Sequence, residues 1–118
     1  MSTSPDNSDL VDFAAAFGTA LHSGDFGAAH AMLSATLADM TAASELSDEY
    51  NVLADDMGGV TGVGQPVVML QDWPGMTEQD RAMVYVPLDG DMFSEAVMVT
   101  VSESPNGLCI SGLEWGRP

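Results

Sequence analysis

An acidic residue stands directly before a tryptophan at two places in the second half of the chain, Asp72-Trp73 and Glu114-Trp115. Each pair ends a segment that we expect to be a strand, where neighbouring side chains point to opposite faces. If the tryptophans point inward, they rim a cavity beside Tyr50 and Tyr85. If the acids point inward, they are buried carboxylates of the kind that proton transfer uses. We favour aromatic core packing with solvated acids.

His30 lies among small apolar residues of an expected helix, where a pocket histidine could act as an acid or a base. We expect it instead to be a hydrogen-bonded or partly exposed helix residue. His22 is eight positions away, outside the usual spacing of two metal ligands on one helix face. Cys109 is the single cysteine and has no partner for an intramolecular disulfide. We therefore expect no metal site and no cofactor.

The chain is strongly acidic, with eighteen Asp and Glu residues against Arg81 and Arg117, and its formal net charge is −16. Such a surface repels phosphate backbones and anionic lipids, so we expect neither nucleic acid nor a membrane as a partner. Adaptation to salt is the favoured explanation, and an acidic face for a basic protein partner is the alternative. The polar start carries no signal-peptide pattern, which predicts a cytoplasmic protein.

Gly58-Gly59 separates two halves with different hydrophobic periods. Before it, apolar residues recur at helical spacing; after it, they alternate as in strands. The first predicted helix is capped by Asn7 or Ser8 and carries an apolar stripe over residues 10–21, and the second is capped by Asp25 and has its apolar face over 26–33. Residues 34–40 are ambiguous and read best as a short helical turn. The third helix is capped by Thr41 and ends at Gly58-Gly59.

Four strands are predicted after this point, at residues 64–73, 82–88, 93–102 and 108–115. Turns at Pro74-Gly75, Asp89-Gly90 and 105–107 join them into an antiparallel meander. The strand at 93–102 is largely apolar on both faces, so we expect its second face to be covered as well. Burial in a strongly curved sheet would cover it, and so would a homodimer that pairs sheet to sheet. We favour the homodimer, because an exposed apolar sheet is a liability.

Helices followed by strands predict one α+β domain over residues 8–118, preceded by a flexible tail at 1–7. The amphipathic first helix, the Ser23-Gly24-Asp25-Phe26 junction and the final Glu114-Trp115 are similar to the nuclear transport factor 2-like superfamily, the cystatin-like cone. That resemblance implies three N-terminal helices packed on a curved four-stranded antiparallel sheet, with any site inside the cone. Enzymes, ligand binders, protein-binding modules and uncharacterised bacterial proteins share this fold. None of the superfamily's catalytic motifs aligns with this sequence.

The function that we expect is therefore a non-enzymatic domain that is homodimeric through its sheet face and binds a small apolar ligand or a protein partner. One alternative is an enzyme of lyase or isomerase type with Asp72 or Glu114 as its base. Another is an acidic immunity-type or inhibitor-type protein against a basic target. The candidate pocket residues are His30, Tyr50, Asp72, Trp73, Tyr85, Glu114 and Trp115.

Overall fold

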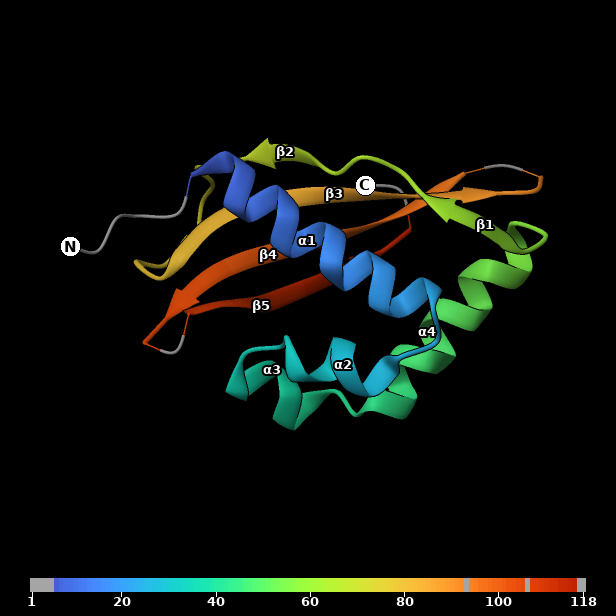
Figure 1. Cartoon of the computed structure of the whole chain (residues 1–118). Coiled ribbons are helices and arrows are strands. Elements are labelled where there is room, and N and C mark those ends of the chain that lie inside the picture. Colours follow the sequence, from blue (N-terminus) through green and yellow to red (C-terminus); the bar gives the residue numbers. More distant parts are fainter. Residues whose placement is uncertain (1–5, 93, 106, 117–118) are drawn as a thin grey trace.

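The computed structural model describes residues 6–92, 94–105 and 107–116. Over these residues the chain is α+β, as the sequence predicts, with four helices before a five-stranded antiparallel sheet (Figure 1). No helix in the described part of the chain is long and apolar enough to cross a membrane. The elements are α1 (Asn7–His22), α2 (Phe26–Ala31), α3 (Ala35–Met40), α4 (Ala43–Asp56), β1 (Val60–Val63), β2 (Val67–Leu70), β3 (Asp80–Gly90), β4 (Glu95–Ser104) and β5 (Gly107–Trp115).

The first helix begins at Asn7, earlier than a cap at Asn7 or Ser8 would place its start. Asp6 is the N-cap: its side chain accepts a hydrogen bond from the Asp9 backbone N–H at 2.9 Å, and Asp9 accepts one from the Asp6 N–H at 3.2 Å. This reciprocal capping box satisfies two backbone donors that would otherwise have no helical partner. The cap is therefore Asp6 rather than Asn7 or Ser8. Residues 1–5 of the predicted tail lie outside the described residues.

The second predicted helix is cut short by pairing with the sheet. Asp25 caps α2 as predicted, accepting from the Ala28 N–H at 3.0 Å, but the helix ends at Ala31. Residues 32–34 then lie along β5, where the Ile110 N–H donates to the Met32 carbonyl at 2.8 Å. The Ser34 N–H donates to the Ile110 carbonyl at 2.7 Å, which completes a parallel bridge. The sequence pattern predicts that the helix continues through residues 32–33, and the structure shows that these two residues are not helical.

The ambiguous segment after this bridge is a helix of its own. Ser34 caps α3 by accepting from the Leu37 N–H at 3.2 Å. The next helix, α4, has Ala42 at its N-cap position rather than Thr41, and Glu45 accepts from the Ala42 N–H at 3.4 Å. The described residues thus form four helices, whereas the sequence pattern predicts three.

The first predicted strand, at 64–73, is the shorter β2, and β1 precedes it as a strand that the sequence pattern does not predict, which makes five strands rather than four. β1 and β2 both pair with β3, and β3, β4 and β5 follow in order as an antiparallel meander. Pro66 lies between β1 and β2 and has no N–H to donate to a ladder. A Cβ on Gly64 would lie 3.1 Å from the Pro87 side chain, so a larger residue there would require Pro87 to shift. Asp72-Trp73 falls in the loop after β2 and not at a strand end.

The predicted turn at Asp89-Gly90 is also wrong, because β3 continues through it. Gly90 pairs with Val60 of β1, and the Asp91 N–H donates to the Gly59 carbonyl at 3.1 Å. Pairing with β1 therefore extends β3 and moves the connection to β4 beyond Gly90. The predicted strand at 93–102 starts at Glu95 as β4, and Phe93 lies outside the described residues. The turn before β5 has Gly107 at φ 119°, where glycine is favoured; Asn106 is not described.

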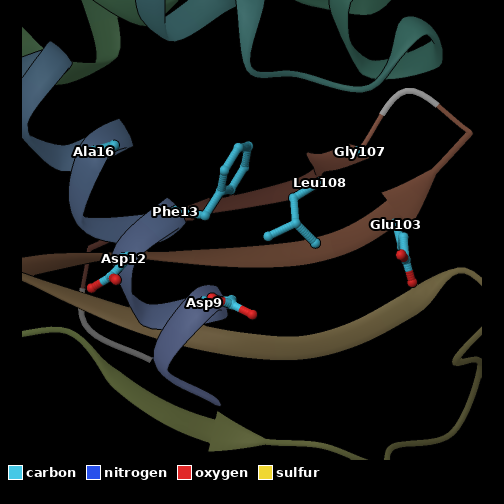
Figure 2. A pocket seen from close by; sticks show the side chains of 7 residues that line it. All are labelled: Asp9, Asp12, Phe13, Ala16, Glu103, Gly107 and Leu108. Atoms are coloured by element: carbon cyan, nitrogen blue, oxygen red, sulfur yellow. The ribbon is translucent and has the colours of Figure 1, made fainter. Parts of the chain in front are cut away.

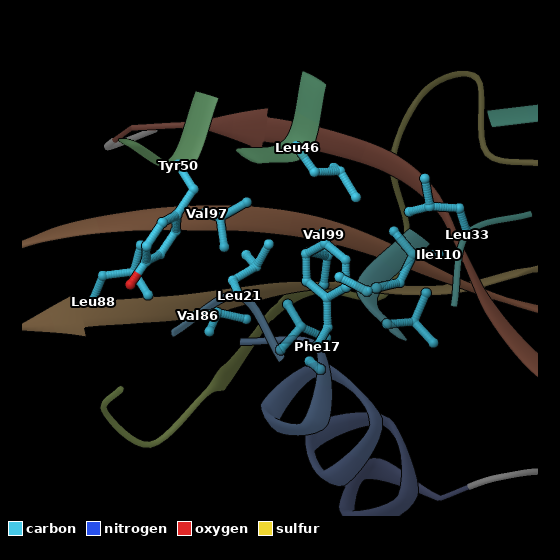
Figure 3. Close-up of a cluster of buried hydrophobic side chains, with 14 of the residues drawn as sticks. Phe17, Leu21, Leu33, Leu46, Tyr50, Val86, Leu88, Val97, Val99 and Ile110 are labelled. Carbon is cyan, nitrogen blue, oxygen red and sulfur yellow. The ribbon is translucent and has the colours of Figure 1, made fainter. Parts of the chain in front are cut away.

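Packed side chains fill the central part of the space between the helices and the sheet. Figure 1 shows α1 lying across one face of the sheet, and Figure 3 shows side chains from α1, α4 and the strands meeting there. Phe17 and Leu21 of α1, Leu46 of α4 and Val86 and Val99 of the sheet are at most 1% exposed. This region corresponds to the cone interior in which the resemblance places a site. Core side chains occupy it.

The second face of the sheet, which points away from this core, is only partly covered. On β4 the second-face residues Ala96 and Met98 are 0% and 8% exposed within a single chain. Both faces of β4 are therefore buried, and its covering needs no second copy. On β2 the second-face residues Val67 and Leu70, which pair with Tyr85 and Met83, are 50% and 45% exposed. The exposed apolar part of this face is at β2.

Gly18 offers a test of the packing of α1 against the sheet. A Cβ at this position would lie 2.8 Å from Cγ1 of Val86 and 3.1 Å from Cγ1 of Val63. Both neighbours are β-branched and have few rotamers with which to yield. We expect Gly18→Ala to lower the free energy of unfolding by about 1–3 kcal/mol in urea titration, because the core is overpacked.

Gly27→Ala in α2 is the matched control. Gly27 is exposed, and the nearest atom to an added Cβ is 3.8 Å away. Removing a helical glycine there should raise stability by up to about 1 kcal/mol. Equal effects of the two substitutions would contradict a close approach of α1 to β3.

Candidate functional site

An open cavity of about 640 Å³ lies on the second face of the sheet. One wall is α3 with the cap residue before it, another is the loop between β2 and β3, and the rest belongs to the paired ends of β4 and β5. Its volume is in the range of small-molecule sites, about 300–1,000 Å³. The lining residues are Ser34, Thr36, Leu37, Met40, Trp73, Thr77, Gln79, Asp80, Thr100, Ser102, Glu103, Ser104, Pro105, Cys109 and Ser111.

Three polar side chains in this lining form one hydrogen-bonded cluster, Asp80 with Ser102 and Ser111. The Ser102 hydroxyl donates to Oδ1 of Asp80 at 2.6 Å, and the two serine Oγ atoms are 2.6 Å apart. Ser111 Oγ also lies 3.5 Å from Asp80 Oδ1. Ser102 is 3% exposed, so its hydroxyl depends on these partners.

Strand register brings these three residues together. Asp80 begins β3 and pairs directly with Ser102 of β4. On β5, Thr100 faces Gly112 whereas Val101 faces Ile110, so Ser111 is an extra residue in the ladder. A bulge of this kind re-aims a side chain, and here the Ser111 hydroxyl reaches Ser102.

Asp80 is held in its charged form. Burial acts to raise the pKa of this carboxyl, but hydrogen bonds from Ser102, from Thr77 and from Ser111 outweigh it and lower the pKa below its ordinary value. Asp80 is therefore an anion at neutral pH. Its lowered pKa also makes it a weak base.

The same carboxylate holds the loop that carries Trp73. The Thr77 N–H donates to Asp80 Oδ2 at 3.0 Å, and the Asp80 N–H donates to the Thr77 carbonyl at 3.2 Å. The Glu103 N–H donates to the Gln79 carbonyl at 2.8 Å, which ties the end of the loop to β4. Loop and sheet are thus joined at the polar part of the cavity.

Apolar side chains supply the other walls. Leu37 and Met40 of α3 line the cavity opposite the sheet, with the partly buried Trp73 on the loop. Met40 is 71% exposed, so its apolar side chain is open to solvent at this wall. The cavity therefore combines an ionised, hydrogen-bonded cluster with an apolar surface open to solvent.

The lining is poorly suited to covalent catalysis. Burial, and then the charge of Asp80, raise the pKa of the Cys109 thiol, so the reactive thiolate is disfavoured. Neither histidine lines the cavity: His30 Nε2 lies 3.2 Å from the Ala38 carbonyl, and His22 Nδ1 lies 3.3 Å from the Tyr50 hydroxyl. The two serines consequently have no histidine to act as their general base.

The residues predicted for the pocket do not gather in one place. Trp73 lines this cavity, while Asp72 is an exposed residue of the same loop. Tyr85 and Glu114 lie on the second face, in register with Met98, but outside the lining.

The remaining three lie on the helical side. His30 is partly buried on α2, as expected for a hydrogen-bonded helix histidine. Tyr50 belongs to the core, where burial raises its pKa and its ring packs at 60° against Phe26. Trp115 packs against the same core.

The residues of the polar cluster were not among those predicted. Ser102 is the last residue of a largely apolar predicted strand, and Ser111 falls in the last predicted strand. A polar residue inside a strand that is apolar on both faces must find a partner, and that signal could have marked Ser102. Nothing local to Asp80 distinguishes it from the other seventeen acidic residues.

A second cavity, of about 530 Å³, lies between α1 and the β4–β5 end of the sheet. Figure 2 shows Phe13 and Leu108 at its centre, with the carboxylates of Asp9, Asp12 and Glu103 around them. Asp9 is engaged in the cap of α1, and Glu103 pairs with Arg81 at 2.9 Å. Two of its three carboxylates are thus already used within the fold.

No group of three His, Cys, Asp or Glu side chains suited to a metal ion occurs within residues 6–92, 94–105 and 107–116. The described acidic residues near the two cavities therefore do not form a metal-binding group of three.

Ser102→Ala tests the coupling of this cluster to stability. Because the folded pKa of Asp80 is lowered, its ionisation stabilises the fold above the unfolded value of 3.8, and this contribution is lost as pH falls through the folded pKa. We expect Ser102→Ala to raise the Asp80 pKa in a carboxyl NMR titration. It should also cost about 1–3 kcal/mol of unfolding free energy at pH 7, with a smaller cost in acid.

Ser44→Ala on the exposed surface of α4 is the control and should leave the Asp80 pKa unchanged. An unaltered Asp80 titration in Ser102→Ala would show that the hydroxyl does not stabilise the carboxylate.

Models of known protein families, curated protein sequences and solved structures were compared with this chain, and none matches. The similarity to the nuclear transport factor 2-like superfamily accordingly remains an expectation from the sequence, and the fold class stands at α+β with a five-stranded antiparallel sheet.

Proposed function

We propose that this protein is a non-enzymatic binding domain whose ligand is a small molecule with an apolar body and a polar end. The ligand would occupy the cavity bounded by α3, Trp73 and Asp80. One observation carries the proposal: an ionised, hydrogen-bonded cluster lies in the lining of an open and largely apolar cavity. A few placed polar groups among apolar walls are typical of small-molecule sites.

Each part of the lining has a distinct role in this proposal. Leu37, Met40 and Trp73 would cover the apolar body, and burial of apolar surface contributes about 25 cal/mol per Å² before ordering costs. Asp80 with the serine hydroxyls would orient the polar end. Because strand pairing holds these groups before the ligand arrives, little ordering is needed on binding.

A binding role fits the chemistry better than the lyase or isomerase alternative. A general base works best when its pKa is near the operating pH, whereas the Asp80 pKa is lowered. Asp72 and Glu114 are exposed, so neither is the buried carboxylate that this alternative requires. The proposed role of the carboxylate is recognition.

Thr36→Trp tests the proposal without touching the core. Thr36 is an exposed residue of α3 that lines the cavity, so an indole there would fill part of it. Nile red, a neutral apolar dye, should bind the unmodified protein saturably in a fluorescence titration. Thr36→Trp should weaken this binding by roughly tenfold or more, a loss of about 1.4 kcal/mol.

Thr19→Trp places the same indole on the exposed surface of α1, away from the cavity, and should leave the affinity unchanged. The proposal fails if Nile red does not saturate, or if both tryptophan variants bind it equally.

We also propose that the chain is a homodimer, with contact through the exposed apolar side chains of β2. Val67, Met69 and Leu70 are 45–50% exposed on a short strand at the sheet edge. Pairing of two such surfaces would remove apolar area from water, while the charge of −16 on each copy opposes association. Contact is therefore expected to strengthen as salt screens that repulsion.

Sedimentation velocity in the micromolar range, at low and high salt, measures this association. Leu70→Glu should shift the protein toward the monomer, because it adds a charge inside the contact. Val52→Glu, at a 62% exposed position on α4, should sediment like the unmodified protein. A monomer at every concentration and salt level would rule out the dimer.

A further inference from the structure

We propose that the polar end of the ligand is a protonated amine, which pairs with the Asp80 carboxylate through the cavity. This inference rests on the proposed function and adds the class of ligand. It follows from the charge of Asp80, from its open acceptor positions and from the electrostatic field of the whole chain.

The negative charge of Asp80 is not balanced within the described part of the chain. Its carboxylate receives hydrogen bonds from the hydroxyls of Ser102, Ser111 and Thr77 and from the Thr77 backbone N–H, all neutral groups. Arg81 is adjacent in sequence, but its guanidinium donates to Glu103 at 2.9 Å and to backbone carbonyls. The ion pair found in residues 6–92, 94–105 and 107–116 is Arg81–Glu103. A cationic ligand would supply the positive charge that the Asp80 carboxylate lacks.

The carboxylate also has room for further donors. A carboxylate offers about four acceptor positions, two on each oxygen. Oδ1 accepts from Ser102 at 2.6 Å and lies 3.5 Å from Ser111 Oγ, whereas Oδ2 accepts from the Thr77 N–H at 3.0 Å, and the Thr77 hydroxyl is a further donor near the carboxylate. An ammonium group carries three donors, so it could meet Oδ2 and nearby hydroxyl oxygens together. A hydroxyl brings one donor and no charge.

The field of the protein selects for the same class of ligand. A net charge of −16 raises the local concentration of cations and lowers that of anions. Within the cavity, Thr100, Ser102 and Ser111 are neutral, and the carboxylate of Glu103 is already paired with Arg81. Asp80 is therefore the group that decides the sign of the ligand's charge.

Three probes of one shape separate charge from size: 2-phenylethylamine, its neutral analogue 2-phenylethanol and the anionic 3-phenylpropionate. Each is titrated into the full chain at pH 7 while backbone amide NMR shifts are followed. We expect the amine to bind about tenfold or more tightly than the alcohol, and the carboxylate to bind least. Shifts should centre on Thr77, Asp80 and Ser102. This comparison uses the unmodified protein and needs no variant to fold.

Asp80→Asn and Asp12→Asn remove one charge each and separate the site from the general field. Asp12 lies in the other cavity and is exposed. Asp80→Asn should bring the amine-to-alcohol affinity ratio close to one, whereas Asp12→Asn should leave it unchanged. Retention of the ratio in folded Asp80→Asn, or equal loss in both variants, would overturn the assignment to Asp80.

The outcomes distinguish the two proposals. Equal affinity for amine and alcohol, with Nile red still binding saturably and Thr36→Trp still weakening that binding, overturns the amine inference and leaves the binding domain in place. Failure of all three probes and of Nile red to bind removes the proposed function itself. A preference for 3-phenylpropionate would also contradict the amine.

Discussion

The hydrogen bonds between residues 32–34 and Ile110 determine where α2 ends and where α3 lies relative to the sheet. They occupy the outer edge of β5, which would otherwise present unpaired backbone groups to solvent. They also end α2 and leave Ser34 extended, in position to cap α3. As a result α3 lies beside the edge of the sheet, where Leu37 and Met40 form a wall of the cavity. A bridge of one residue pair thus creates both an element boundary and a side of the candidate site.

The two faces of the sheet consequently have different roles. On the helical face, Phe17, Leu46 and Val99 are at most 1% exposed and form part of the core, and the cavity on that side lies at the end of the sheet beside Phe13 and Leu108. The second face carries hydroxyls and a carboxylate among apolar residues, and its cover is the loop that bears Trp73 rather than a layer of helices. Close packing stabilises the fold on one side, and incomplete cover leaves a cavity on the other. The resemblance of the sequence to the cone-shaped superfamily predicts a site on the helical face instead.

Hydrophobic periodicity and capping residues predict those helices and strands whose bounds depend on interactions between residues close in sequence. Helical periodicity and the Asp25 cap identify α1, α4 and the start of α2, and alternation identifies β3, β4 and β5 to within a few residues. The errors at residues 32–34 and at Gly90 have a common cause, because each segment follows a distant strand that it pairs with. Of the site, only Trp73 was predicted. Asp80, Ser102 and Ser111 come together through register and a bulge in β5, which a single sequence does not reveal.

The charge of Asp80 has two consequences. An asparagine there could accept a hydrogen bond from Ser102 or Thr77 without adding to the self-repulsion of an acidic chain. Hydrogen bonds to a carboxylate are roughly twice as strong as those to a neutral acceptor, so the charge holds the Trp73 loop more firmly. The same carboxylate belongs to the lining of the cavity. The Asp80 carboxylate therefore holds the loop that forms one wall of the site, and it also presents a negative charge to a ligand in the cavity. One residue thus determines both the order of the loop and the charge of the ligand that the site prefers.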